Sequence, residues 1–204
     1  MMMKRTTPRV AALVLLLALV LVSCGGGQGG GGRQGGGGGG SQTTAGEKAT
    51  TGTTTAHKKA TIGVVKSYSN LSRDHVRGHI NYPQNPPVGG PHNPVWQNCG
   101  FYSKPVRNEH AVHSMEHGAV WITYRPDLPK DQVEKIKSLT QKSYVLASPY
   151  PGLPAPVVAS AWGKQLRLDS ANDPRLEQFV IDYSQGPQTP EPGAPCTGGV
   201  GSPE

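Results

Sequence analysis

The sequence predicts an α+β fold: a single compact domain with a mainly antiparallel sheet and two or three helices, after a disordered Gly-rich tether. Two observations support this class. Short β-branched or aromatic runs alternate with only two clearly amphipathic helical segments. The connections are long, and residues 83–94 alone contain five prolines and two glycines. We place the globular α+β domain at residues 57–204.

The strand signals are short and spread along this domain. A β-like run occupies residues 61–65, and residues 119–124 give the clearest signal because they are β-branched and aromatic. Residues 144–147 form another strand candidate. Strand signals then recur at 157–158 and 166–168.

Two helices are predicted from periodicity and capping. Residues 131–142 place apolar side chains at helical spacing. Asp173 can cap a second helix, and Pro174 suits its first position because the missing N–H has no intrahelical partner there. We expect this helix to end near Ser184.

An export signal opens the chain. Lys4, Arg5 and Arg9 precede a charge-free apolar run at residues 10–22. These 13 residues are too few for a membrane-crossing helix, which needs about 20. We predict that residues 1–23 are a signal peptide.

The end of the apolar run resembles the lipobox of bacterial lipoproteins, with Leu-Val-Ser-Cys at residues 21–24. The resemblance implies a lipid on Cys24 and a lipid-anchored protein at the outer, extracytoplasmic face of the cell membrane. The alternative is an ordinary cleaved signal peptide with an unrelated cysteine. Residues 24–56 are then the lipidated cysteine and a flexible Gly/Thr-rich linker. Of the 16 residues from 25 to 40, 13 are glycine, so this segment buries too little apolar surface to fold.

The charge distribution argues against nucleic acid as a partner. The formal net charge is +7, but the predicted signal peptide holds three basic residues and no acidic one, so +4 remains after cleavage. No block of lysine and arginine with interleaved aromatic residues is present. The membrane is the expected partner, and the sequence does not identify a protein or cell-wall partner.

Three cysteines require an explanation in an exported chain, where disulfides form readily. Lipidation of Cys24 leaves Cys99 and Cys196, which we expect to pair. The alternatives are two separate thiols or a metal bound by Cys99.

Six of the seven histidines fall between residues 75 and 117. They are His75, His79, His92, His110, His113 and His117. Asn108 and Glu109 favour a helix start, and Gly118 favours a helix end just before the strongest strand. A helix of about two turns places His110, His113 and His117 on one face.

Imidazoles at this spacing can chelate a transition metal such as zinc or copper. We predict a metal site at His113 and His117, with His92 as the first choice for a third ligand from a loop. His75 and His110 are further candidates. The alternative is that these histidines form a buried hydrogen-bonded network or a solvated surface.

Another hypothesis is a metal-dependent hydrolase. Residues 113–117 match the pattern H-x-x-E-H, in which Glu116 would be the general base and the only catalytic candidate. The predicted helix is too short for that class of protease, so we lean away from an enzyme. Glu116 can instead orient a ligand imidazole.

Several segments together resemble a bacterial, often membrane-anchored family of unknown function, which carries PP-x-SG-x-H and VH-S-x-EHG signatures. The matching segments are Asn85-Pro86-Pro87, Gly89-Gly90-Pro91-His92, Cys99-Gly100-Phe101-Tyr102 and Val112-His113-Ser114-Met115-Glu116-His117-Gly118. Gly89 departs from the signature, which usually has serine there. The resemblance implies a shared fold and a shared site at His92, His113, Glu116 and His117, but no established activity.

The leading hypothesis is therefore an extracytoplasmic, lipid-anchored domain that binds a transition metal for sensing, storage or handover. The second is a lipid-tethered cell-envelope interaction module whose histidines are structural.

Overall fold

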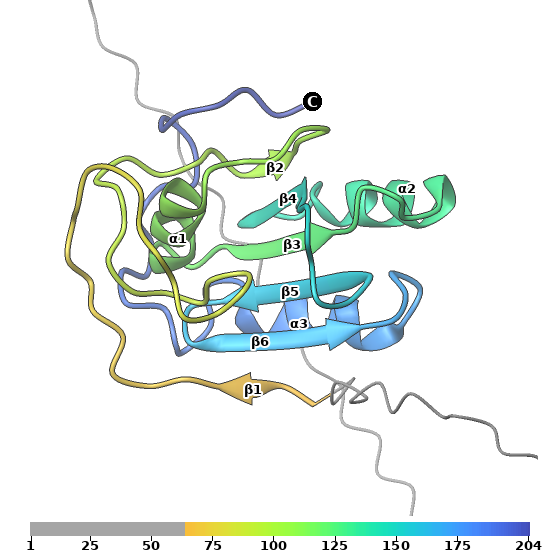
Figure 1. Ribbon diagram of the computed structural model, residues 1–204, viewed down its shortest axis with the longest axis horizontal. Coiled ribbons are helices and arrows are strands. Elements are labelled where there is room, and N and C mark those ends of the chain that lie inside the picture. The colour runs from red at the N-terminus through yellow and green to blue at the C-terminus, as the bar shows by residue number, and fades with distance from the viewer. Residues whose placement is uncertain (1–63) are drawn as a thin grey trace, which may run out of the picture. The chain divides into compact units, whose positions relative to one another are not determined.

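A six-stranded mixed sheet organises residues 64–204, the part of the chain that the computed structural model describes (Figure 1). The strands are β1 (Lys66–Ser67), β2 (Gly100–Phe101), β3 (Val120–Tyr124), β4 (Val145–Pro149), β5 (Val157–Ala161) and β6 (Lys164–Leu168). The helices are α1 (Asn108–Glu116), α2 (Lys130–Leu139) and α3 (Pro174–Tyr183). The predicted signal peptide, Cys24 and the linker lie outside the described residues. Within residues 64–204, no helix combines the length and hydrophobicity needed to span a bilayer.

The order of the strands across the sheet is β1-β6-β5-β3-β4-β2. The three pairings from β1 to β3 are antiparallel, which confirms the predicted mainly antiparallel α+β class. The two pairings of β4, with β3 and with β2, are parallel. The β3–β4 pairing is parallel because α2 connects these strands and returns the chain to the end of the sheet at which β3 began, as parallel neighbours require.

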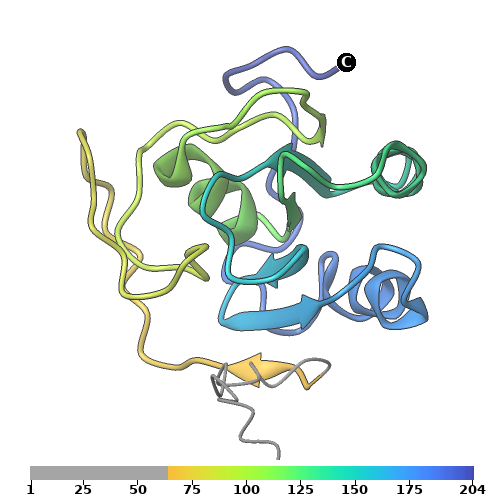
Figure 2. The ribbon, with the colours of Figure 1, turned by 45° about the vertical axis from the view of Figure 1, so that its right-hand side comes forward.

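Helices cover both faces of the sheet. In Figure 2, α1 lies on one side of the strands and α2 and α3 lie on the other. Side chains alternate accordingly along β3: Val120 and Ile122 join the core beneath α2 and α3, whereas Trp121 joins the core beneath α1. Each face of the sheet is therefore packed, and α1 is held against its own apolar layer.

Most elements form where the sequence placed them. The clearest predicted strand is β3, and Pro174 begins α3 with the Asp173 carboxylate accepting a hydrogen bond from the Arg175 amide at 3.0 Å. The prediction of a strand at residues 61–65 was wrong in its described part. Val64 and Val65 precede the first strand, which begins at Lys66. Strand β2 was not predicted, because two residues give no periodicity to detect.

A disulfide joins Cys99 to Cys196, as expected, with the two Cα atoms 5.4 Å apart and 97 positions apart in sequence. It fixes the Pro/Gly-rich C-terminal segment beside the chain that leads into β2. Backbone hydrogen bonds reinforce the junction, from the Cys99 amide to the Cys196 carbonyl at 2.8 Å and from the Glu204 amide to the Phe101 carbonyl at 2.8 Å. The irregular tail is thus a fixed part of the domain.

Removing the disulfide should lower the free energy of unfolding by roughly 4–5 kcal/mol, because a loop of nearly 100 residues is then no longer closed in the unfolded chain. Denaturant unfolding of a Cys99→Ser/Cys196→Ser variant measures this. A phosphine reductant should destabilise the wild type by a similar amount and leave the variant unchanged. Equal stability of wild type and variant would contradict the prediction.

Candidate metal centre

Helix α1 supplies three of the side chains of the site. His113 and Glu116 lie on its last turn and His117 is its C-cap, and the i, i+4 spacing brings the rings of His113 and His117 to 4.5 Å between centroids. The helix ends as predicted, with Gly118 at a φ of +97° that a side chain would disfavour. The N-cap is Arg107 rather than the predicted Asn108. The side-chain amide of Asn108 donates instead to the Tyr150 hydroxyl.

A glycine-rich turn places His92 beneath this helix. Gly89 has a φ of +141°, and a Cβ there would lie 2.8 Å from Leu71 and 3.2 Å from Trp162. A serine at this position, as in the family signature, would require both neighbours to move. Because the turn packs so closely, His92 is fully buried and its ring lies 5.8 Å from that of Trp162.

Backbone pairing brings a second segment to His92. The His92 amide donates to the Asp74 carbonyl at 2.9 Å, and the Val76 amide donates to the His92 carbonyl at 2.7 Å. This short parallel bridge sets His75 beside His92. The ring centroids of His75, His92 and His113 lie 4.9 Å apart in each pair.

Backbone carbonyls orient three of the imidazoles. The Nδ1 atoms of His92, His113 and His117 each lie within hydrogen-bonding distance of a carbonyl oxygen. The acceptors are Gly90 at 2.8 Å, Asn93 at 2.7 Å and Pro195 at 2.7 Å. A carbonyl only accepts, so each Nδ1 carries a proton, and any of these rings that is neutral presents the lone pair of Nε2. Metal-binding histidines are typically oriented by such hydrogen bonds.

The Nε2 atoms converge on one another and on a carboxylate. One potential ligand atom from each of His75, His92, His113 and Glu116 lies within 4.8 Å of all the others. The His92 Nε2 is 2.9 Å from a Glu116 oxygen, and the His113 Nε2 is 2.9 Å from the His117 Nε2. With neutral rings, both contacts bring two acceptors together. Each therefore requires a shared proton or a cation.

Burial and neighbouring groups together set the charges of His113 and Glu116. It lowers the pKa of His113 to about 4, an effect that its hydrogen bond to the Asn93 carbonyl opposes and the neighbouring histidines strengthen. Burial alone would raise the pKa of Glu116, but the hydrogen bond with His92 and the nearby histidines bring it below its usual value. At neutral pH the centre thus holds a neutral His113 and an ionised Glu116, the forms that bind metals.

The structure brings together some of the predicted site residues and not others. His92 and His113 belong to the compact group, and His75 completes it. His117 lies beside the group through its contact with His113, and its Nε2 is also 3.6 Å from a Glu191 oxygen. His110 lies outside the group, because its Nδ1 donates to the Val95 carbonyl.

Glu116 is placed as a direct ligand candidate, a role that the sequence reasoning did not give it. Its i, i+3 spacing from His113 on a helix is the signal that would have suggested this role. Glu191 was missed altogether, since only the folded tail brings it near His117.

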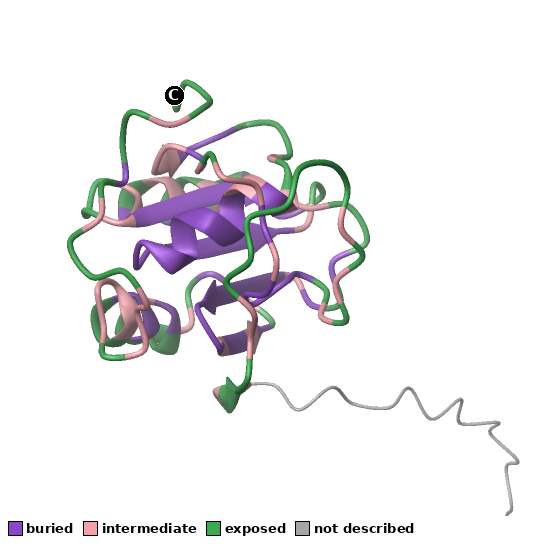
Figure 3. Ribbon diagram, turned by 90° about the vertical axis from the view of Figure 1, so that its left-hand side faces the viewer, coloured by how far each residue is buried: buried purple, intermediate pink, exposed green. Residues whose placement is uncertain are grey.

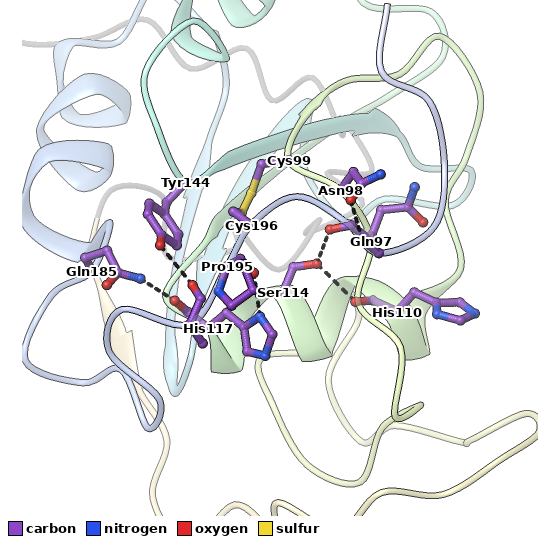
Figure 4. Close-up of a disulfide and its surroundings, with 12 residues drawn as sticks. Gln97, Asn98, Cys99, His110, Ser114, His117, Tyr144, Gln185, Pro195 and Cys196 are labelled. Atoms are coloured by element: carbon purple, nitrogen blue, oxygen red, sulfur yellow. Dashed lines mark hydrogen bonds between the residues drawn. A yellow bond between two sulfur atoms is a disulfide. The ribbon is translucent and has the colours of Figure 1, made fainter. Parts of the chain in front are cut away.

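The disulfide-fixed tail helps to hold His117. Figure 4 shows Pro195, whose carbonyl accepts the hydrogen bond from His117, directly before Cys196. One turn earlier on α1, the Ser114 hydroxyl donates to the carbonyl of Gln97, two residues before Cys99, at 2.6 Å. The disulfide thus links two segments that each contact the helix bearing the site.

Fold and site together define a small α+β domain with a buried histidine–carboxylate cluster. Residues 75–198 match a family described as a protein of unknown function, DUF3105, and the chain belongs to that family. The matched segment begins at His75 and ends just beyond Cys196, so it contains the whole cluster and the disulfide. Neither the curated proteins nor the solved structures gave a significant match.

The metal-free protein should lose stability as the pH falls from 6.5 to 5. In this window the unfolded His113 takes up a proton, while the folded one, with a pKa near 4, does not. Protons therefore favour unfolding, by about 2 kcal/mol over this range. Glu116 contributes only at lower pH, because its pKa is lowered from 4.5. Denaturant unfolding at several pH values should show a shallower dependence in His113→Gln. Parallel curves for the two proteins would contradict the assignment.

Proposed function

We propose that this domain binds one divalent transition-metal ion through His92, His113, Glu116 and His75. The observation that carries the proposal is the convergence of buried acceptors. His92 and His113, whose Nδ1 protons are used elsewhere, present their Nε2 atoms beside the Glu116 carboxylate and the His75 ring. A cation satisfies all of these lone pairs at once, whereas protons must satisfy them one contact at a time.

Zinc is the first choice of metal, and copper(II) is the second. Imidazole nitrogens and carboxylate oxygens are both ligands of zinc, and four donors suit its tetrahedral preference. Copper(I) is disfavoured because it prefers sulfur ligands. Met115 is fully buried in the apolar layer between α1 and the sheet, and the disulfide occupies Cys99.

Handover, storage or sensing of the metal fits this centre better than catalysis. The four protein donors, three of them buried, fill the positions of a tetrahedral site, and Glu116, the general base of the hydrolase hypothesis, is then used as a ligand. The export signal and the lipobox-like residues 21–24 support a location on the outer face of the membrane, with the metal centre tethered by residues 24–56.

The second candidate is an interaction module with structural histidines. The contact of 2.9 Å between His92 and Glu116 favours it, because a protonated His92 would form an ordinary ion pair at this distance. In that alternative the histidines stabilise the fold without metal.

Elemental analysis separates the two candidates. The full-length protein, purified in mild detergent after growth with zinc and copper, should contain about one metal ion per chain. A His92→Gln/Glu116→Gln variant should lose the metal, and added zinc should raise the Tm of the wild type but not of this variant. His79→Gln/His110→Gln makes a matched control, because it removes two histidines outside the group and should retain the metal. A wild type without stoichiometric metal would leave the structural role as the better account.

The membrane anchor is tested separately. A Cys24→Ala variant should no longer incorporate labelled fatty acid and should leave the membrane fraction, because a lipidated cysteine is the proposed attachment. Cys99→Ser/Cys196→Ser should still be labelled. Labelling that persists in Cys24→Ala would refute the lipid anchor and leave the metal proposal untouched.

A further inference from the structure

The four donors of the centre are not equally fixed. His92, His113 and Glu116 are 0%, 4% and 1% exposed, whereas the His75 side chain is 47% exposed. The buried rings are held by hydrogen bonds from Nδ1. Within residues 64–204, the structure shows no hydrogen bond to the His75 ring, although its Nε2 lies 3.8 Å from a Glu116 oxygen. Ring contacts with His92 and His113 therefore hold His75, whereas hydrogen bonds hold the other three donors.

The segment that carries His75 is also irregular and largely exposed. Residues 68–80 contain no helix or extended strand, and most of them are exposed. In Figure 3 the exposed chain that leaves β1 passes in front of the buried helix α1. The two backbone hydrogen bonds with His92 anchor this segment at Asp74 and Val76. The backbone of His75 is thus held at the centre, while about half of its side chain, whose ring stacks on His113, is open to solvent.

A positive charge lies on the same face. Arg73 is largely exposed, and its Nε is 4.0 Å from a Glu116 oxygen. With a divalent ion bound, the single carboxylate of the group leaves an excess of positive charge that Arg73 increases. An anionic ligand that approaches from solvent is favoured by this field.

We propose that His75 is the exchange ligand of the metal centre, and that the metal enters and leaves through the face formed by His75 and Arg73. The incoming group is an anionic ligand, a carboxylate or a thiolate, of a metal donor or acceptor. As its bond to the metal forms, the bond from His75 Nε2 breaks and the imidazole leaves with its lone pair. No electron is transferred to or from the metal. This inference rests on the proposed metal-binding function.

Cobalt(II) as a visible-absorbing probe tests the role of His75 in the full-length protein. His75→Ala should still bind about one cobalt, and should release it to EDTA about tenfold faster than the wild type. Added imidazole should restore the wild-type spectrum and slow the release, because it fills the vacated exposed position. His113→Ala, at a buried position, should show no such rescue. His79→Ala, on the same segment, is the matched control and should behave as wild type, and equal Tm values of His75→Ala and His79→Ala exclude unfolding.

A variant at Arg73 tests whether positive charge favours an anionic ligand. Arg73→Gln should slow cobalt transfer to anionic EDTA severalfold and leave transfer to the uncharged chelator phenanthroline unchanged. Equal EDTA rates in Arg73→Gln and wild type would overturn the anionic partner.

The outcomes separate this inference from the metal proposal. A wild type that binds no metal overturns both. A wild type that binds cobalt, with His75→Ala releasing it at the same rate or losing it entirely without rescue, overturns the exchange role alone.

Discussion

The centre depends on hydrogen bonds from three histidine Nδ1 atoms to backbone carbonyls. Gly90, Asn93 and Pro195 provide these carbonyls from two different segments of the chain. Because the protonated Nδ1 atoms point outward to backbone carbonyls, the Nε2 lone pairs face one another in a buried space. Unsatisfied buried acceptors are costly, and the histidines cannot leave without breaking the carbonyl contacts. The arrangement is therefore stable only if a proton or a cation lies between them.

The rest of the fold keeps those carbonyls in place. Trp121 and Met115 fix α1 on one face of the sheet, while Trp162 and Leu71 leave room only for a glycine in the turn before His92. The disulfide joins the Pro195 segment to the chain that packs along α1. A small sheet with short strands thus supports a centre built mainly from loops, since covalent and backbone constraints replace regular structure there.

Local signals in the sequence predicted the local parts of this structure. The capping pair Asp173 and Pro174 predicted the start of α3, and the spacing of His113 and His117 predicted their contact on a short helix. The pairing of Cys99 with Cys196 was predicted from the count of three cysteines, since Cys24 was assigned to lipidation. Strand β2, the parallel pairing of β4 and the approach of Glu191 to His117 depend on contacts between distant segments, and no local pattern encodes these. His75 was only the second choice among loop ligands, because its bridge to His92 joins two irregular segments.

The contrast between three buried donors and the half-exposed His75 suggests how such a centre would function, holding a metal firmly while keeping one side open. The most direct test is X-ray crystallography of the zinc-loaded protein with anomalous scattering at the zinc edge. The account predicts one zinc about 2.0–2.2 Å from His92 Nε2, His113 Nε2 and a Glu116 oxygen, with the Nδ1 contacts to Gly90 and Asn93 unchanged. Zinc bound elsewhere, or a centre without metal in which His92 and Glu116 remain in direct contact, would contradict it.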